Sequence, residues 1–183
     1  MTANLSLIKP DVNERIEEAL PTFAGWAAQN AINMDNIDAL FRATTHSYSP
    51  SWTAATTNPT LGAGGSVTGK YLRLFPRMVI GHFLIFTGGA GFAAGSGFYN
   101  ISAPVAMPTE LLTFADSIPV GKAAFHDNSA VLTSTVFEIM CSVTTGNFFL
   151  KDPSGASWTD VSPVVPAQND RLTGYFMYPT SAV

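Results

Sequence analysis

Residues 66–87 read SVTGKYLRLFPRMVIGHFLIFT, and this stretch decides the fold class. On each side of Pro76-Arg77 lies a run rich in aliphatic, β-branched and aromatic residues, which are typical of strands. The proline and the arginine stand where a turn must reverse the chain. The second run has no charged residue, as expected of a buried strand. We therefore predict a β-hairpin with strands at 66–75 and 78–87.

Five further runs of strand-forming residues follow along the chain, separated by clusters of turn residues such as those at 152–155. The candidate strands lie at 97–102, 120–126, 134–142, 147–151 and 172–178. Seven short strands at this spacing predict a mainly β fold, an antiparallel β-sandwich of the jelly-roll kind, over residues 46–183. Residues 78–99 carry no Asp, Glu, Lys or Arg, but His82 and six glycines there favour a strand and a loop over a membrane span.

Residues 1–45 are different in character and predict a short helical segment ahead of the β domain. They hold nine of the 22 charged residues, and Asp11 with Glu14 has the spacing of a capping box. No secretory signal is expected at the start. A seam with helical spacing follows, at Phe23, Ala27, Asn30, Met34, Ile37 and Phe41. We predict that residues 1–45 anchor and oligomerise the chain through this seam; a helix packed on its own domain would give nearly the same pattern.

Charged residues are scarce, at 12% of the 183 residues, and the formal net charge is −4. No segment is rich in lysine or arginine, so nucleic acid is not an expected partner. A single domain of this size normally spreads many charges over its surface for solubility. The scarcity indicates that copies of the same chain, or a larger assembly, cover much of this surface.

No constellation of residues indicates catalysis, a metal site or a cofactor. Residues 64–70 match the spacing GxxxxGK, but Tyr71 follows where a phosphate loop needs Ser or Thr, and the segment continues into a predicted strand. His126 and Asp127 are adjacent in a strand and so point to opposite faces. Cys141 lies in an apolar strand and is predicted to be a core residue. We expect neither an enzyme nor a bound metal or cofactor.

Aromatic side chains leave a binding function open, because they can stack on sugar rings. They also fill the core of a β-sandwich, and we assign Tyr175 and Phe176 to that core. Trp158 lies in a stretch typical of loops, GASWTD at 155–160, and is the better candidate for ligand contact.

Part of the sequence resembles a β domain that recurs in minor tail and other virion-surface proteins of actinobacterial phages. The resemblance rests on Trp52-Thr53, on NPTLG at 58–62 and on GSVTGKYLR at 65–73, and in outline it extends over residues 51–178. It implies a phage structural component, a homotrimer with a β head displayed on the particle, and it implies no catalytic residue.

We therefore expect a structural protein on the surface of a phage particle, assembled in the host cytoplasm. Its expected partners are its own copies and other virion proteins, with neither membrane nor nucleic acid. The sequence does not decide between a tail fibre or minor tail protein and a head-decoration protein. Two alternatives stay open: a carbohydrate-binding module that recognises host polysaccharide through Trp158, and a tail-borne hydrolase.

Overall fold

The computed structural model describes residues 30–35, 44–74, 77–108, 116–128, 133–142 and 144–180. The chain divides into two units, of which the second is Thr44–Ser181 and the first comprises the remaining residues. In the first unit, the described residues 30–35 are helical. All the described strands belong to the second unit, which we call the β unit.

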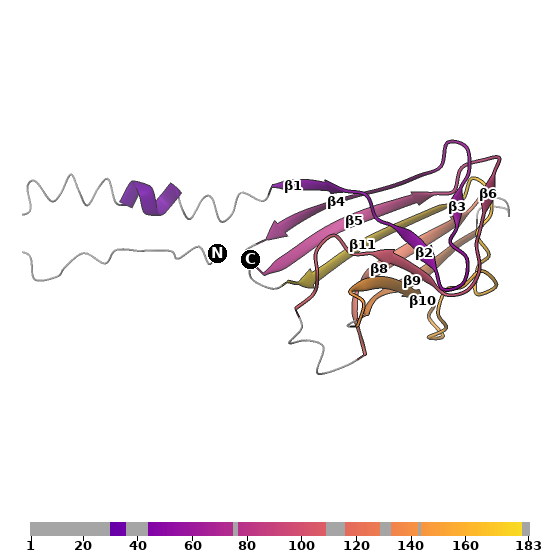
Figure 1. Ribbon diagram of the computed structural model, residues 1–183. Coiled ribbons are helices and arrows are strands. Elements are labelled where there is room, and N and C mark those ends of the chain that lie inside the picture. Colours follow the sequence, from indigo (N-terminus) through magenta and orange to yellow (C-terminus); the bar gives the residue numbers. More distant parts are fainter. Residues whose placement is uncertain are drawn as a thin grey trace, which may run out of the picture. The chain divides into compact units, whose positions relative to one another are not determined.

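Eleven strands are present in the described part of the β unit (Figure 1). They are β1 (Thr45–Tyr48), β2 (Trp52–Ala54), β3 (Thr60–Leu61), β4 (Ser66–Leu74), β5 (Met78–Phe86), β6 (Phe92–Ala93), β7 (Tyr99–Ser102), β8 (Ser117–Asp127), β9 (Thr133–Ser142), β10 (Asn147–Lys151) and β11 (Arg171–Pro179). Nine of them form one sheet in the order β1-β4-β5-β11-β8-β9-β10-β7-β2, and β3 pairs with β6 separately. Every pairing is antiparallel.

The predicted hairpin is confirmed, since β4 and β5 pair along their whole length from Ser66 opposite Phe86 to Leu74 opposite Met78. The other predicted strands correspond to β7, β8, β9, β10 and β11. Sequence reasoning missed β1, β2, β3 and β6, which have two to four residues each and are too short to show a period of two. Residues 78–99 include β5, β6 and the start of β7, so the strand expected there in place of a membrane span is present. Within the described residues, no helix is long and apolar enough to cross a membrane.

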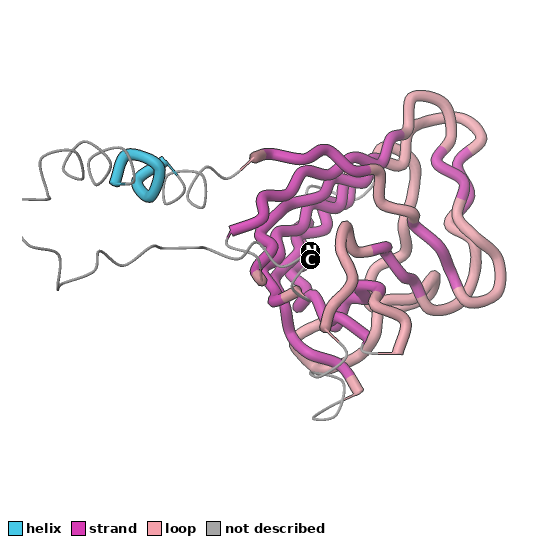
Figure 2. Tube along the Cα trace, turned by 60° about the vertical axis from the view of Figure 1, so that its left-hand side comes forward, coloured by secondary structure: helices cyan, strands magenta, loops and turns pink. Residues whose placement is uncertain are grey.

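The sheet curls strongly, and glycines inside its strands allow it to do so. On the inward side, a large aromatic ring from one strand lies over a glycine of a neighbouring strand, where any side chain would collide with the ring. These pairs are Tyr48 over Gly69, Phe176 over Gly81, and Phe83 over Gly174. Figure 2 shows the resulting arc of strands around the interior of the β unit.

The curl brings non-neighbouring strands together across one core. Phe148 on β10 lies 4.9 Å from Phe176 and 5.7 Å from Tyr178 between ring centroids, although β8 and β9 separate β10 from β11 in the sheet. Inward residues alternate with outward ones along β11, whose burial changes at every residue. Burial of this aromatic and aliphatic interior is the main source of stability for the β unit.

The mainly β, antiparallel class predicted from the sequence is confirmed. The two facing sheets of a sandwich are not shown, because eight of the nine strand pairings join nine strands into one continuous sheet that bends round on itself, and the ninth only joins the two-residue strands β3 and β6. A bulge between Pro119 and Gly121 in β8 adds to the bending of that strand. The curled sheet buries one face and leaves the other toward solvent.

We predict that Gly81→Ala destabilises the β unit. A Cβ at this position would lie 2.6 Å from the backbone oxygen of Lys70 and 2.6 Å from the Phe176 ring, so backbone or ring must shift. Overpacking of this kind costs about 1–3 kcal/mol of unfolding free energy, measurable by urea denaturation followed by tryptophan fluorescence.

Gly89→Ala is the matched control for this prediction. The nearest atom to a Cβ at Gly89 is the backbone oxygen of Ala63 at 3.8 Å, which is ordinary contact. Its unfolding free energy should stay within about 1 kcal/mol of the parent protein or rise slightly. Equal stability of the two variants would contradict the role given to Gly81.

Candidate functional site

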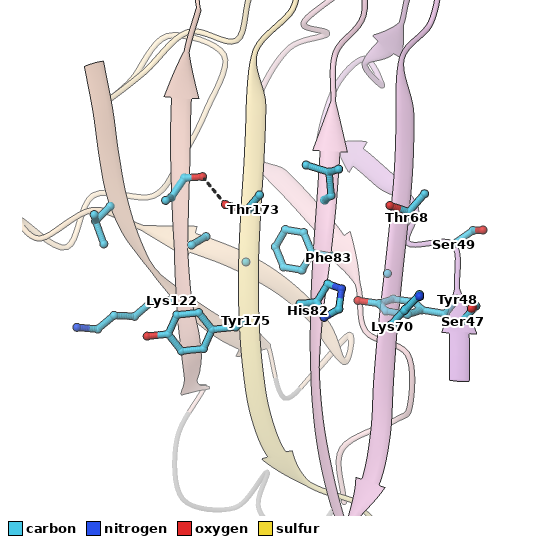
Figure 3. Close-up of a pocket in the computed structure, with 16 residues that line it drawn as sticks. Ser47, Tyr48, Ser49, Thr68, Lys70, His82, Phe83, Lys122, Thr173 and Tyr175 are labelled. Atoms are coloured by element: carbon cyan, nitrogen blue, oxygen red, sulfur yellow. Dashed lines mark hydrogen bonds between the residues drawn. The ribbon is translucent and has the colours of Figure 1, made fainter. Parts of the chain in front are cut away.

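The solvent side of the sheet, which we call the outer face, consists of the outward residues of β4, β5, β11, β8 and β9. Cross-strand register aligns these residues in rows that run across the strands. One row places Lys122, Tyr175, His82 and Lys70 side by side on β8, β11, β5 and β4, and Ser47 on the neighbouring β1 continues it. Figure 3 shows this row of side chains crossing the sheet.

One end of the outer face is apolar. This apolar end consists of Leu72, Met78, Ile80 and Met177, and Met177 leaves 55% of its surface exposed. A hollow of about 520 Å³ lies here between β4, β5 and β11. Exposed large apolar side chains gathered at one place mark a contact surface more often than scattered ones do.

Next to the apolar end lies a wider groove of about 1060 Å³, which we call the basic groove. Its lining includes Lys70 on one side, Lys122 on the other, and Tyr175 with His82 between them. Hydroxyl groups of Ser47, Thr68 and Thr173 also line it. An aromatic ring between two cations, with hydroxyls around it, can hold a ligand that has both apolar faces and negative groups.

Trp158, predicted to contact a ligand, is buried, and Tyr175, predicted to lie in the core, is exposed. Trp158 is only 1% exposed, and its ring stacks within the core on Trp52, 5.9 Å away, and lies 4.5 Å from Tyr99. Its Nε1 donates a hydrogen bond to the carbonyl oxygen of Val164 at 2.9 Å, which satisfies its polar atom inside the protein. This place does not fit the predicted ligand contact, because a buried ring cannot stack on a sugar.

The core position predicted for Tyr175 together with Phe176 is wrong for Tyr175. Phe176 is buried, whereas Tyr175 is 61% exposed on the outer face. The two residues are adjacent on β11 and must point to opposite sides of the sheet. The alternation was visible in the sequence, but the residue that faces inward was not.

Most of the predicted oligomerisation seam lies outside the described residues, namely Phe23, Ala27, Ile37 and Phe41. Asn30 and Met34 belong to the helical residues 30–35, where Asn30 is half-buried and Met34 is exposed. The seam therefore stays a prediction.

Three carboxylates of the β unit fasten loops. Asp170 is fully buried and accepts hydrogen bonds through both carboxylate oxygens. At Asp152, a hydrogen bond donated by the Ser154 hydroxyl lowers the pKa of the carboxyl group. The backbone donors are Asn128 and Ala167 to Asp170, Gly97 to Asp160, and Ser154 with Ala156 to Asp152. In the part of the chain that the structure describes, no three His, Cys, Asp or Glu side chains gather as a metal site requires.

The segment that matches the GxxxxGK spacing leads into β4 and not into a helix, as the sequence indicated. The core position predicted for Cys141 is also confirmed, since its side chain is fully buried on β9. Burial raises the pKa of the Cys141 thiol to about 11. The reactive thiolate is therefore scarce at neutral pH.

We predict that Cys141 is inert toward Ellman's reagent in the folded protein at pH 8, because the thiol is both buried and protonated. It is the one cysteine of the chain, so the absorbance reports on it alone. In guanidinium chloride the full equivalent should react within minutes. Rapid reaction of the native protein would contradict the burial of β9.

No protein-family model matches the chain, and neither a curated protein nor a solved structure is significantly similar to it. No ligand or activity is therefore carried over to the outer face from a relative. Its own residues offer two kinds of surface: apolar side chains for packing at one end, and an aromatic ring between cations in the basic groove.

Proposed function

We propose that this chain is a non-enzymatic structural protein of a bacteriophage particle, where it assembles with copies of itself and with other virion proteins. The observation that carries the proposal is the apolar end of the outer face. Met78, Ile80 and Met177 are all exposed there, side by side on β5 and β11. Burying such a surface contributes about 25 cal/mol for each Å² removed from water.

Composition supports the same proposal. With 12% charged residues, the chain lacks the ionic surface that keeps a free monomer soluble. A neighbouring copy seated on the apolar end would remove the exposed methionines and Ile80 from water. Stable interfaces of this kind bury about 1,200–2,000 Å² in total.

The phage part of the proposal rests on the resemblance of residues 51–178 to virion-surface domains of actinobacterial phages. That resemblance is also the support for a homotrimer and for display on the particle, as a tail component or a head decoration. The jelly-roll sandwich belongs to this proposal as well: β10 would belong to the layer that faces β11, and the contact of Phe148 with Phe176 supports it.

We predict that the full chain is an oligomer in solution and that I80D with M177D converts it to a monomer. Two carboxylates at a buried apolar contact would lose their hydration without gaining partners, which strongly disfavours association. Sedimentation velocity at several protein concentrations measures the change.

The matched control is V161D with V165D, which also adds two carboxylates at exposed valines but in the loop ahead of β11. This control should sediment like the parent protein. A parent protein that stays monomeric at the highest attainable concentration would contradict self-assembly. Immunogold labelling of intact phage particles tests the virion location, and unlabelled particles would contradict it.

A further inference from the structure

We propose that the basic groove binds an acidic polysaccharide, with a sugar ring stacked on Tyr175 and sugar carboxylates paired with Lys70 and Lys122. The side chains of all three residues line the groove and belong to one cross-strand row. This binding function goes beyond the structural role proposed above and does not depend on it.

The first argument is the exposure of Tyr175. The ring leaves 61% of its surface to solvent in the middle of the sheet, between His82 on β5 and Lys122 on β8. An isolated exposed tyrosine needs no explanation. Here hydrogen-bonding side chains flank the ring on both sides, and that arrangement matches a sugar, which presents an apolar ring face and polar edges.

The second argument is the separation of charges in the β unit. The outward positions of β4, β11 and β8 carry Lys70, Arg171 and Lys122. Among the described residues of β4, β5, β11, β8 and β9, one carboxylate occupies an outward position, that of Glu138 on β9. Glu138 lies opposite Lys122 on one side and opposite Lys151 on the other. A chain with a net charge of −4 thus presents a face of positive charge, which attracts anions.

The third argument is the length of the row. Lys70 and Lys122 lie on strands that β5 and β11 separate. Three strand spacings place their backbones roughly 14 Å apart. A ligand that reaches both cations must be longer than a single sugar ring and must carry repeated negative groups. A polysaccharide with a carboxylate on its sugar units meets both conditions.

Two other occupants fit the groove less well. A second copy docked over the basic groove by two-fold symmetry would bring Lys70 and Lys122 against their own counterparts, and like charges in an interface oppose association. A nucleic acid is bound mainly through many phosphate contacts, and this face has few cations for its width. The exposed ring with surrounding hydroxyl groups favours the sugar.

The test is isothermal titration calorimetry of the full chain at low salt with four probes. These are hexagalacturonate, a hyaluronan hexasaccharide, neutral maltohexaose and single-stranded DNA. At least one of the acidic hexasaccharides should bind about tenfold or more tightly than maltohexaose, which corresponds to about 1.4 kcal/mol. Added sodium chloride should weaken this binding, because salt screens the exposed lysines.

Variants assign the binding to the groove. Tyr175→Ala should weaken binding of the acidic hexasaccharide about tenfold, whereas Tyr175→Phe, which keeps the ring, should retain it. Lys70→Gln with Lys122→Gln should weaken binding and reduce its salt dependence. Arg77→Gln removes a charge outside the groove and serves as the control. Each variant is first checked by circular dichroism and sedimentation for an unchanged fold and assembly.

The proposal is overturned if neither acidic hexasaccharide binds, if maltohexaose binds equally well, or if Tyr175→Ala leaves the affinity unchanged. Tighter binding of the DNA probe would assign the face to nucleic acid instead. Because assembly is measured separately by sedimentation, failure of this proposal leaves self-association intact, and the reverse also holds.

Discussion

A wide aromatic ring can approach the backbone of a β-sheet closely only where the strand beneath it has no side chain, and the curl of the β unit rests on three such contacts. Tyr48, Phe83 and Phe176 each lie over a glycine of a neighbouring strand. The rings fill the space close to the backbone, so the sheet can curl around them without leaving voids. The curl closes the interior and brings Phe148 on β10 against Phe176 on β11.

The same curl separates the two faces of the sheet. Large apolar side chains on the inward side find partners across the core, with Trp158 at the centre of an aromatic cluster. The outward side is left with Met177, Tyr175 and a row of basic residues. Apolar groups on this face favour packing against another protein surface, whereas the cationic groups attract anions. The two proposals, for assembly and for glycan binding, follow from this division.

Local pattern was sufficient for strands long enough to repeat their alternation. The hairpin of β4 and β5 and the five later strands were predicted close to their observed bounds, because runs of strand-forming residues and the turn residues between them are visible in the sequence itself. Short strands such as β2 and β6 were missed. They form because a partner strand offers hydrogen bonds. When that partner lies far along the chain, the two or three residues of a short strand show no pattern from which the pairing could be predicted.

Composition and local pattern were enough to predict the mainly β, antiparallel class, the buried Cys141 and the scarcity of charge, since all three are properties of composition or of neighbouring residues. Which side of each strand faces the core became visible only in the folded chain. The fold buried Trp158 from a loop of small and polar residues, because Val164 accepts its indole hydrogen bond and other rings surround it. It exposed Tyr175, because Phe176 beside it fits over Gly81 and adjacent residues of a strand must face opposite ways.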